Sequence, residues 1–116
     1  MIAGSALTAC GGGSEVSQAE VEAAREEKQV RRAEKAFAEF RRLHPAGGCG
    51  DEIFVNARAN CGFARNMRSV YYAEAFRGTK VFYPFDPKVS RDVKMRCTEQ
   101  PPHKCTGEGN RVVFFR

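Results

Sequence analysis

The sequence lacks several features that would point to catalysis or to a membrane-spanning segment. Its 116 residues include no tryptophan, only two histidines and no apolar run near the roughly 18 residues that a spanning helix needs. There is no Gly-x-Ser-x-Gly motif, no phosphate-binding glycine-rich loop and no carboxylate pair spaced for hydrolysis. His44 and His103 have the context of solvated surface residues rather than of catalytic bases. We therefore expect no enzymatic activity, no cofactor and no bound metal.

The first fourteen residues are uncharged and mostly small. Within them, Leu7-Thr8-Ala9-Cys10 resembles a bacterial lipobox, in which a diacylglycerol is attached to the cysteine thiol and the chain is cut just before it. A secretory leader has a basic region and about 7–15 apolar residues before its cleavage site. Because only nine residues without a base precede Cys10, we expect the biological start to lie upstream of Met1. The resemblance implies that residues 1–9 end a signal peptide, and that residues 10–14 are the lipidated cysteine and a flexible glycine-rich linker.

Residues 15–45 are predicted to form a helical spacer. From residue 15 to residue 43 there is no glycine or proline, and Ser14 or Ser17 can cap the first turn. Apolar residues follow a heptad pattern at Val16, Ala19, Ala23, Val30, Ala33, Phe37 and Phe40. Because the early positions are mostly alanine, we expect Phe37, Phe40 and Leu43 to dock on the next domain while the first half projects into solvent. A homodimeric coiled coil through this helix is the alternative.

Residues 49–116 are predicted to form a small α+β domain. The pattern predicts strands within 51–57, 79–83, 93–98 and 111–115, with a helix from about residue 61 to residue 77. Residues 101–102 and 106–110 have the composition of turns. The order strand, helix, strand, strand, strand predicts one helix packed on an antiparallel sheet. The fold class is thus α+β, with a long N-terminal helix followed by a small disulfide-stapled domain.

Four cysteines lie in this domain, at Cys49, Cys61, Cys97 and Cys105. An even number favours two disulfides if the compartment is oxidising. Of the three pairings, we favour Cys49 with Cys61 and Cys97 with Cys105, because sequential pairing closes short loops that contribute about 3 kcal/mol each. A four-cysteine zinc site, with His103 as a substitute ligand, is the alternative, although the spacings lack the paired C-x₂₋₄-C knuckles of structural zinc.

Four runs in the domain carry a family resemblance: residues 60–68 (NCGFARNMR), 83–87 (YPFDP), 93–97 (VKMRC) and 105–114 (CTGEGNRVVF). Together they resemble a small extracytoplasmic domain that is frequent in actinobacterial secreted proteins and lipoproteins. The chain departs from that pattern at Phe85-Asp86-Pro87 and at Glu108, where a second glycine is usual. The resemblance implies the fold, the disulfides and the location without implying an activity. Such lipoproteins also occur in temperate phage genomes, where some are thought to act against superinfection.

The net charge of +5 arises entirely after residue 42, because residues 15–42 contain seven acidic and seven basic side chains. The candidate polyanion-binding residues are Arg65, Arg68, Tyr72, Lys80, Lys94 and Arg96. We expect a lipid-anchored protein on the extracytoplasmic face of the cell membrane that acts as a binding or structural module. Its expected partner is an envelope protein or an anionic envelope component, not nucleic acid. The alternative is a cytoplasmic basic nucleic-acid-binding protein with reduced or zinc-bound cysteines.

Overall fold

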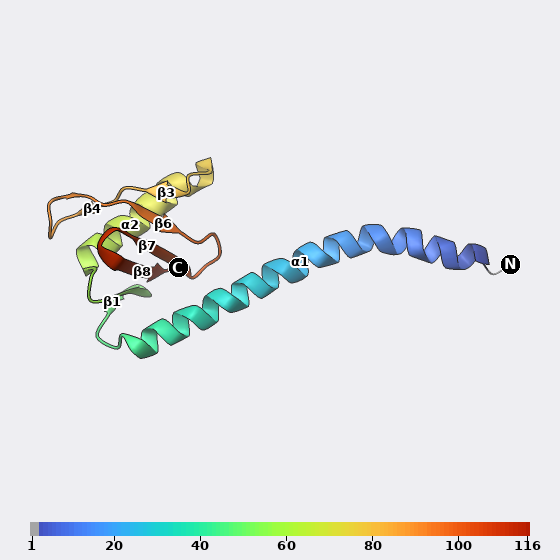
Figure 1. Cartoon of the computed structure of the whole chain (residues 1–116), viewed down its shortest axis with the longest axis horizontal. Helices are drawn as coiled ribbons and strands as arrows, with labels where there is room; N and C mark the ends of the chain where they lie inside the picture. Colours follow the sequence, from blue (N-terminus) through green and yellow to red (C-terminus); the bar gives the residue numbers. More distant parts are fainter. Residues whose placement is uncertain (1–2) are drawn as a thin grey trace.

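A computed structural model describes the backbone of residues 3–116 and the side chains from residue 17 onward. The chain forms one long helix, α1 (Ala3–Leu43), and a folded domain at the C-terminal end of that helix (Figure 1). The molecule measures 74 × 31 × 22 Å along its principal axes, because α1 projects far beyond the domain. Among the described residues, no helix is both long and apolar enough to cross a membrane.

Helix α1 begins earlier than predicted. It starts at Ala3 rather than near Ser14 or Ser17, so residues 11–13, which we expected to form a flexible linker, lie within the helix. Glycine in a helix interior costs roughly 1 kcal/mol relative to alanine, which is why the three successive glycines favoured a linker. The predicted lipidation at Cys10 concerns a side chain outside the described ones.

The domain is built on a six-stranded antiparallel sheet with the strand order β1-β2-β8-β7-β6-β3. Its strands are β1 (Gly48–Gly50), β2 (Ile53–Val55), β3 (Val81–Phe82), β6 (Met95–Cys97), β7 (His103–Gly107) and β8 (Arg111–Phe115). A separate hairpin pairs β4 (Phe85–Asp86) with β5 (Arg91–Asp92).

The four predicted strands correspond to β2, β3, β6 and β8, whereas β1, β7 and the small hairpin were not predicted. We expected a solvated surface position at His103 and a turn beginning at Thr106, but both residues belong to β7. Strand β7 lies between β6 and β8 and pairs with both of them. Two neighbouring ladders therefore override the turn preference of its sequence.

One face of the sheet is covered by α2 (Cys61–Glu74), which continues as the 3₁₀ helix η1 (Ala75–Arg77). Asn60 caps α2, because its side-chain oxygen accepts a hydrogen bond of 2.8 Å from the Phe63 amide. The helix ends before Gly78, whose φ of +83° favours glycine. The core between α2 and the sheet includes Phe63, Met67, Phe82, Val93, Met95, Val113 and Phe115, all at most 1% exposed.

The last turns of α1 pack on the opposite face of the sheet. Phe37 is 3% exposed and Phe40 is 9% exposed, and both rings contact Phe114. The prediction that these two residues dock is therefore confirmed. The prediction for Leu43 is wrong, because its side chain is 58% exposed. At 100° per residue Leu43 lies off the face shared by the two phenylalanines, and the ring of His44 packs against Phe40 instead, with centroids 4.4 Å apart.

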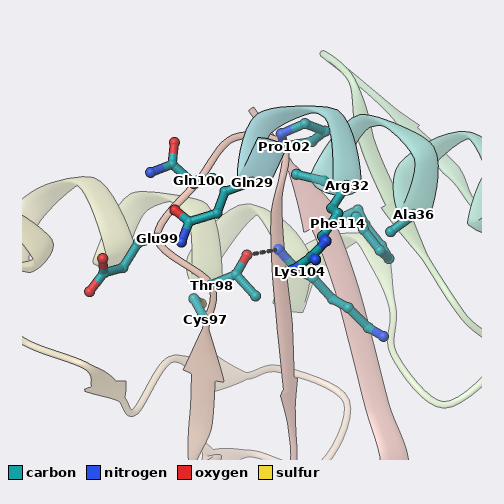
Figure 2. Close-up of a pocket in the computed structure, with 11 residues that line it drawn as sticks. Gln29, Arg32, Ala36, Cys97, Thr98, Glu99, Gln100, Pro102, Lys104 and Phe114 are labelled. Carbon is teal, nitrogen blue, oxygen red and sulfur yellow. Dashed lines mark hydrogen bonds between the residues drawn. The ribbon is translucent and has the colours of Figure 1, made fainter. Parts of the chain in front are cut away.

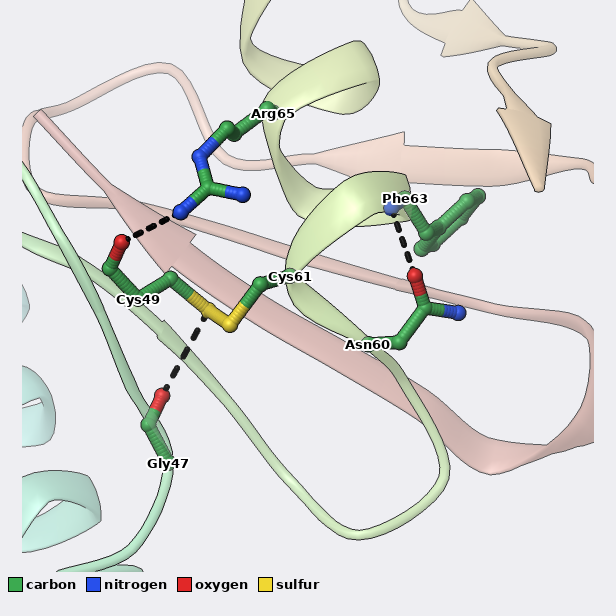
Figure 3. Close-up of a disulfide and its surroundings, with 6 residues drawn as sticks. All are labelled: Gly47, Cys49, Asn60, Cys61, Phe63 and Arg65. Atoms are coloured by element: carbon green, nitrogen blue, oxygen red, sulfur yellow. Dashed lines mark hydrogen bonds between the residues drawn. A yellow bond between two sulfur atoms is a disulfide. The ribbon is translucent and has the colours of Figure 1, made fainter. Parts of the chain in front are cut away.

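Both predicted disulfides are confirmed. Cys49–Cys61 joins β1 to the first residue of α2, with Cα atoms 5.4 Å apart (Figure 3). Cys97–Cys105 joins directly paired positions of β6 and β7, with Cα atoms 4.0 Å apart. Each of these four sulfur atoms is bonded in a disulfide, so none of them is available as a zinc ligand.

Candidate binding site

The six candidate polyanion-binding residues lie on different parts of the domain. Arg65, Arg68 and Tyr72 share one stripe of α2 at spacings of three and four residues. Arg96 lies on the other face of the sheet, because its neighbours Met95 and Cys97 are packed toward α2. Arg96 and Lys80 line one pocket of about 200 Å³ together with Tyr71. The six candidates therefore do not form one surface, although two of them lie together.

Lys80 and Lys94 are also separate from the α2 stripe. Lys80 precedes β3 and lies 3.8 Å from a Glu99 carboxylate oxygen. The side chain of Lys94 is exposed, and its backbone amide donates a hydrogen bond of 2.6 Å to Glu108 Oε1. Each of these two lysines thus has a local acidic neighbour of its own.

The two arginines on α2 contribute to the fold. Arg65 Nη2 donates to the carbonyl oxygen of Cys49 at 2.8 Å (Figure 3), which links α2 to β1. Arg68 Nε donates to the carbonyl oxygen of Arg116 at 3.0 Å, and its guanidinium lies 5.4 Å from the centre of the Tyr72 ring. Both arginines therefore hold neighbouring segments in place, and their remaining N–H groups are the part that an anion could use.

An exposed aromatic pair lies at the end of this helix. Tyr72 is 51% exposed and Phe76, four residues later, is 75% exposed. The guanidinium of Arg77 lies 5.1 Å from the centre of the Phe76 ring. We did not predict Phe76 as a surface residue. Its position four residues after Tyr72 and next to Arg77 could have indicated that it lies on the same exposed face of the helix.

A groove separates α1 from the end of the sheet near the loop that joins β6 to β7 (Figure 2). Its volume is about 490 Å³. It is lined by Gln29, Arg32, Ala33, Ala36, Cys97, Thr98, Glu99, Gln100, Pro102, Lys104 and Phe114. The sequence did not predict this groove, because its two walls are about seventy residues apart along the chain. The only local signal was the small size of the alanines that precede Phe37.

The buried polar residues form a structural network at another end of the domain. Asp86, 1% exposed, accepts hydrogen bonds from Asn60 Nδ2, from the Lys88 amide and from Arg111 Nε at 2.9, 2.9 and 3.1 Å. Burial alone would raise the pKa of Asp86, but these bonds together lower it. The network connects the cap of α2, the small hairpin and β8, and so stabilises the fold without forming an accessible site.

His103 is not the solvated residue that we predicted, because its side chain is only 5% exposed. Its ring lies between those of Tyr71 and Phe115, with centroid distances of 4.3 and 5.3 Å, and its Nδ1 lies 2.9 Å from the Thr98 carbonyl oxygen. Burial lowers the pKa of His103, and it raises the pKa of Tyr71. His103 is thus a core residue of the sheet.

Among the side chains of residues 17–116, no group of three or more His, Cys, Asp and Glu is arranged to hold a metal ion. The groove beside α1 and the aromatic end of α2 are surface features with binding potential, and another cavity of about 480 Å³ lies between the loop that follows α1 and the start of α2. No protein-family model, no curated protein and no solved structure matches this chain. The resemblance to the small extracytoplasmic domain accordingly stays a prediction.

Proposed function

We propose that this protein is a lipid-anchored extracytoplasmic binding module. In this proposal a diacylglycerol on Cys10 holds the chain at the membrane, α1 acts as a spacer, and the disulfide-stapled domain meets a partner in the cell envelope. The lipobox-like Leu7-Thr8-Ala9-Cys10 supplies the anchor.

The observation that carries the proposal is the projection of α1. Every residue from Ser17 to Arg32 is exposed, and among the described side chains of α1 only Phe37 and Phe40 are buried. Phe37 follows Cys10 by 27 positions in the same helix, which corresponds to about 40 Å at a rise of 1.5 Å per residue. A helix of this length between an anchor and a domain determines how far the domain stands from the membrane.

The junction between α1 and the domain is reinforced by ion pairs. Arg116 donates two hydrogen bonds to the Glu34 carboxylate, at 2.8 and 2.9 Å, and a third to Glu52 Oε1 at 2.9 Å. The hydrogen bonds from Arg116 lower the pKa of Glu34. The guanidiniums of Arg41 and Arg116 lie 5.5 and 5.6 Å from the centre of the Phe37 ring. These contacts support a spacer that is rigid at the point where it meets the domain.

The two disulfides support an oxidising compartment. Disulfides persist in secreted and cell-surface proteins and are rare in the cytosol, where thiols are kept reduced. Four of the five cysteines are paired, and Cys10 is the remaining one. This division agrees with a proposal in which four cysteines stabilise the domain and the fifth carries the lipid.

The test is to express the chain in a bacterium with a basic and apolar leader placed before Met1, beside a Cys10→Ser variant. We expect the parent chain to incorporate labelled fatty acid, to lose everything before Cys10 and to sediment with membranes. The Cys10→Ser variant should incorporate no label while retaining both disulfides by mass spectrometry. An unlabelled parent chain, or free thiols at the four domain cysteines after export, would contradict the proposal.

A further inference from the structure

We infer that the groove between α1 and the β6–β7 end of the sheet binds an extended, acidic and partly apolar peptide segment of a protein partner. This inference concerns the surface that recognises the partner, and it does not depend on whether Cys10 carries a lipid. Figure 2 shows α1 above the groove and the ends of β6 and β7 on its other side.

The groove exists because α1 touches the sheet at few positions. Phe37 and Phe40 contact Phe114 from one end, whereas the two alanines that precede them, Ala33 and Ala36, are too small to reach the sheet. The loop that joins β6 to β7 closes the other side. The resulting volume of about 490 Å³ lies within the range of about 300–1,000 Å³ that is typical of ligand sites.

The floor of the groove is apolar. Ala33 and Ala36 come from α1, Pro102 comes from the loop, and the Phe114 ring comes from β8. Pro102 is buried and Phe114 is only 1% exposed, so the apolar surface that a ligand can reach comes from Ala33, which is half-buried, and from Ala36, which is exposed. This accessible apolar surface favours a ligand with apolar side chains that can lie against it.

Two cations line the groove, Arg32 from α1 and Lys104 from β7, and the Lys104 ammonium lies 5.9 Å from the centre of the Phe114 ring. Within the described side chains neither of them has a carboxylate within 4.0 Å, unlike Arg31, Arg42 and Arg116, which are paired with Glu27, Glu39 and Glu34. The one acidic residue that lines the groove, Glu99, lies 3.8 Å from Lys80. Charge complementarity therefore favours an acidic ligand.

The polar groups between the cations favour a peptide. Gln29, Gln100 and Thr98 place two amides and a hydroxyl along the groove, and such groups can donate to and accept from the peptide groups of an extended chain. Single-stranded nucleic acid would need exposed rings on which bases can stack, and Phe114, the only ring in the lining, is buried. A peptide with alternating acidic and apolar side chains matches both the walls and the floor.

The test uses the full chain with both disulfides formed and a fluorescein-labelled hexapeptide in which Glu and Leu alternate. We expect saturable binding measured by fluorescence anisotropy, and no binding of a hexapeptide in which Lys replaces Glu. Arg32→Ala and Lys104→Ala should each weaken binding about tenfold, as expected for the loss of one hydrogen bond to a charged group. Ala33→Leu should also weaken binding, because the larger side chain occupies the groove.

The matched control is Arg31→Ala, which removes the neighbouring cation of α1 that pairs with Glu27 outside the groove. It should leave the affinity unchanged, and circular dichroism should show that every variant is folded. The inference is overturned if Arg31→Ala weakens binding as much as Arg32→Ala, if no peptide binds, or if the chain binds phosphatidylglycerol vesicles through Arg32 and Lys104 in place of the peptide. Since the lipid on Cys10 plays no part in this assay, its outcome is separate from that of the lipidation test.

Discussion

Replacing Phe37 with alanine should release α1 from the domain. The Phe37 side chain is 3% exposed, and its ring centre lies 5.4 Å from that of Phe54 and 5.6 Å from that of Phe114. Truncating a buried phenylalanine to alanine costs about 3–5 kcal/mol. At 1.4 kcal/mol per power of ten, the undocked population of α1 should rise by about two to three and a half powers of ten.

The effect should be local to one face of the sheet. Phe37, Phe40 and Phe114 form a small cluster with Phe54 and Val112, whereas the core beneath α2 is a separate cluster on the other face. Amide hydrogen exchange in residues 33–43 should therefore accelerate in Phe37→Ala, while the amides of β7 remain protected. Exchange followed by mass spectrometry of peptides from both regions measures the two effects in one experiment.

Phe76→Ala is the matched control, because it removes the same side chain from a position that is 75% exposed. Its effect on the free energy of unfolding should stay within about 0.5 kcal/mol. Unchanged protection of residues 33–43 in Phe37→Ala would refute the reasoning that aromatic burial fixes the helix. Equal effects of the two substitutions would refute it as well.

Three further predictions concern the stability of the domain. Replacing both Cys97 and Cys105 with alanine removes the disulfide that closes a loop with a sequence separation of 8. The free energy of unfolding should fall by about 2.5 kcal/mol, measured by urea denaturation. An unchanged urea midpoint of unfolding would contradict this. Asp86→Asn leaves the buried guanidinium of Arg111 without its counterion, and it should lower the free energy of unfolding by about 3–5 kcal/mol. Asp92→Asn, at an exposed position, should change the free energy of unfolding little in the same urea denaturation. Burial lowers the pKa of His103 from 6.5, so in acid the unfolded chain binds more protons than the folded chain does. The free energy of unfolding should therefore fall as the pH drops below about 6.5. His103→Phe should reduce this dependence on pH between about pH 7 and about pH 5.

The local features that the sequence predicted correctly depend on short-range patterns. The helix predicted from about residue 61 to residue 77 follows from apolar residues three and four positions apart, and Phe63, Ala64 and Met67 on it are buried. The disulfide pairs follow from loop length, since both pairs join cysteines separated by only 12 or 8 positions. The docking of Phe37 and Phe40 follows from their size in a seam that is otherwise rich in alanine.

The features that the sequence did not predict depend on contacts between distant segments. Strand β7 forms because β6 and β8 pair with it on both sides, although its residues have the composition of a loop. His103 is buried because its position in β7 turns its ring toward Tyr71 and Phe115. Neither neighbour is adjacent in the chain, so composition alone predicted solvent exposure for this histidine.

The same distinction applies to function. The sequence by itself determined the α+β class, the cysteine pairs, the long polar helix and the lipobox-like motif, because each is a matter of residue type and short spacing. Only the tertiary structure decided that the six basic and aromatic candidates do not form one surface, that Arg65 and Arg68 contact backbone carbonyls, and that Arg32 and Lys104 line one groove. The physical reason is that the alternation of side chains across a sheet sends Arg96 and Met95 to opposite faces, while packing brings α1 next to strands that follow it by about seventy residues.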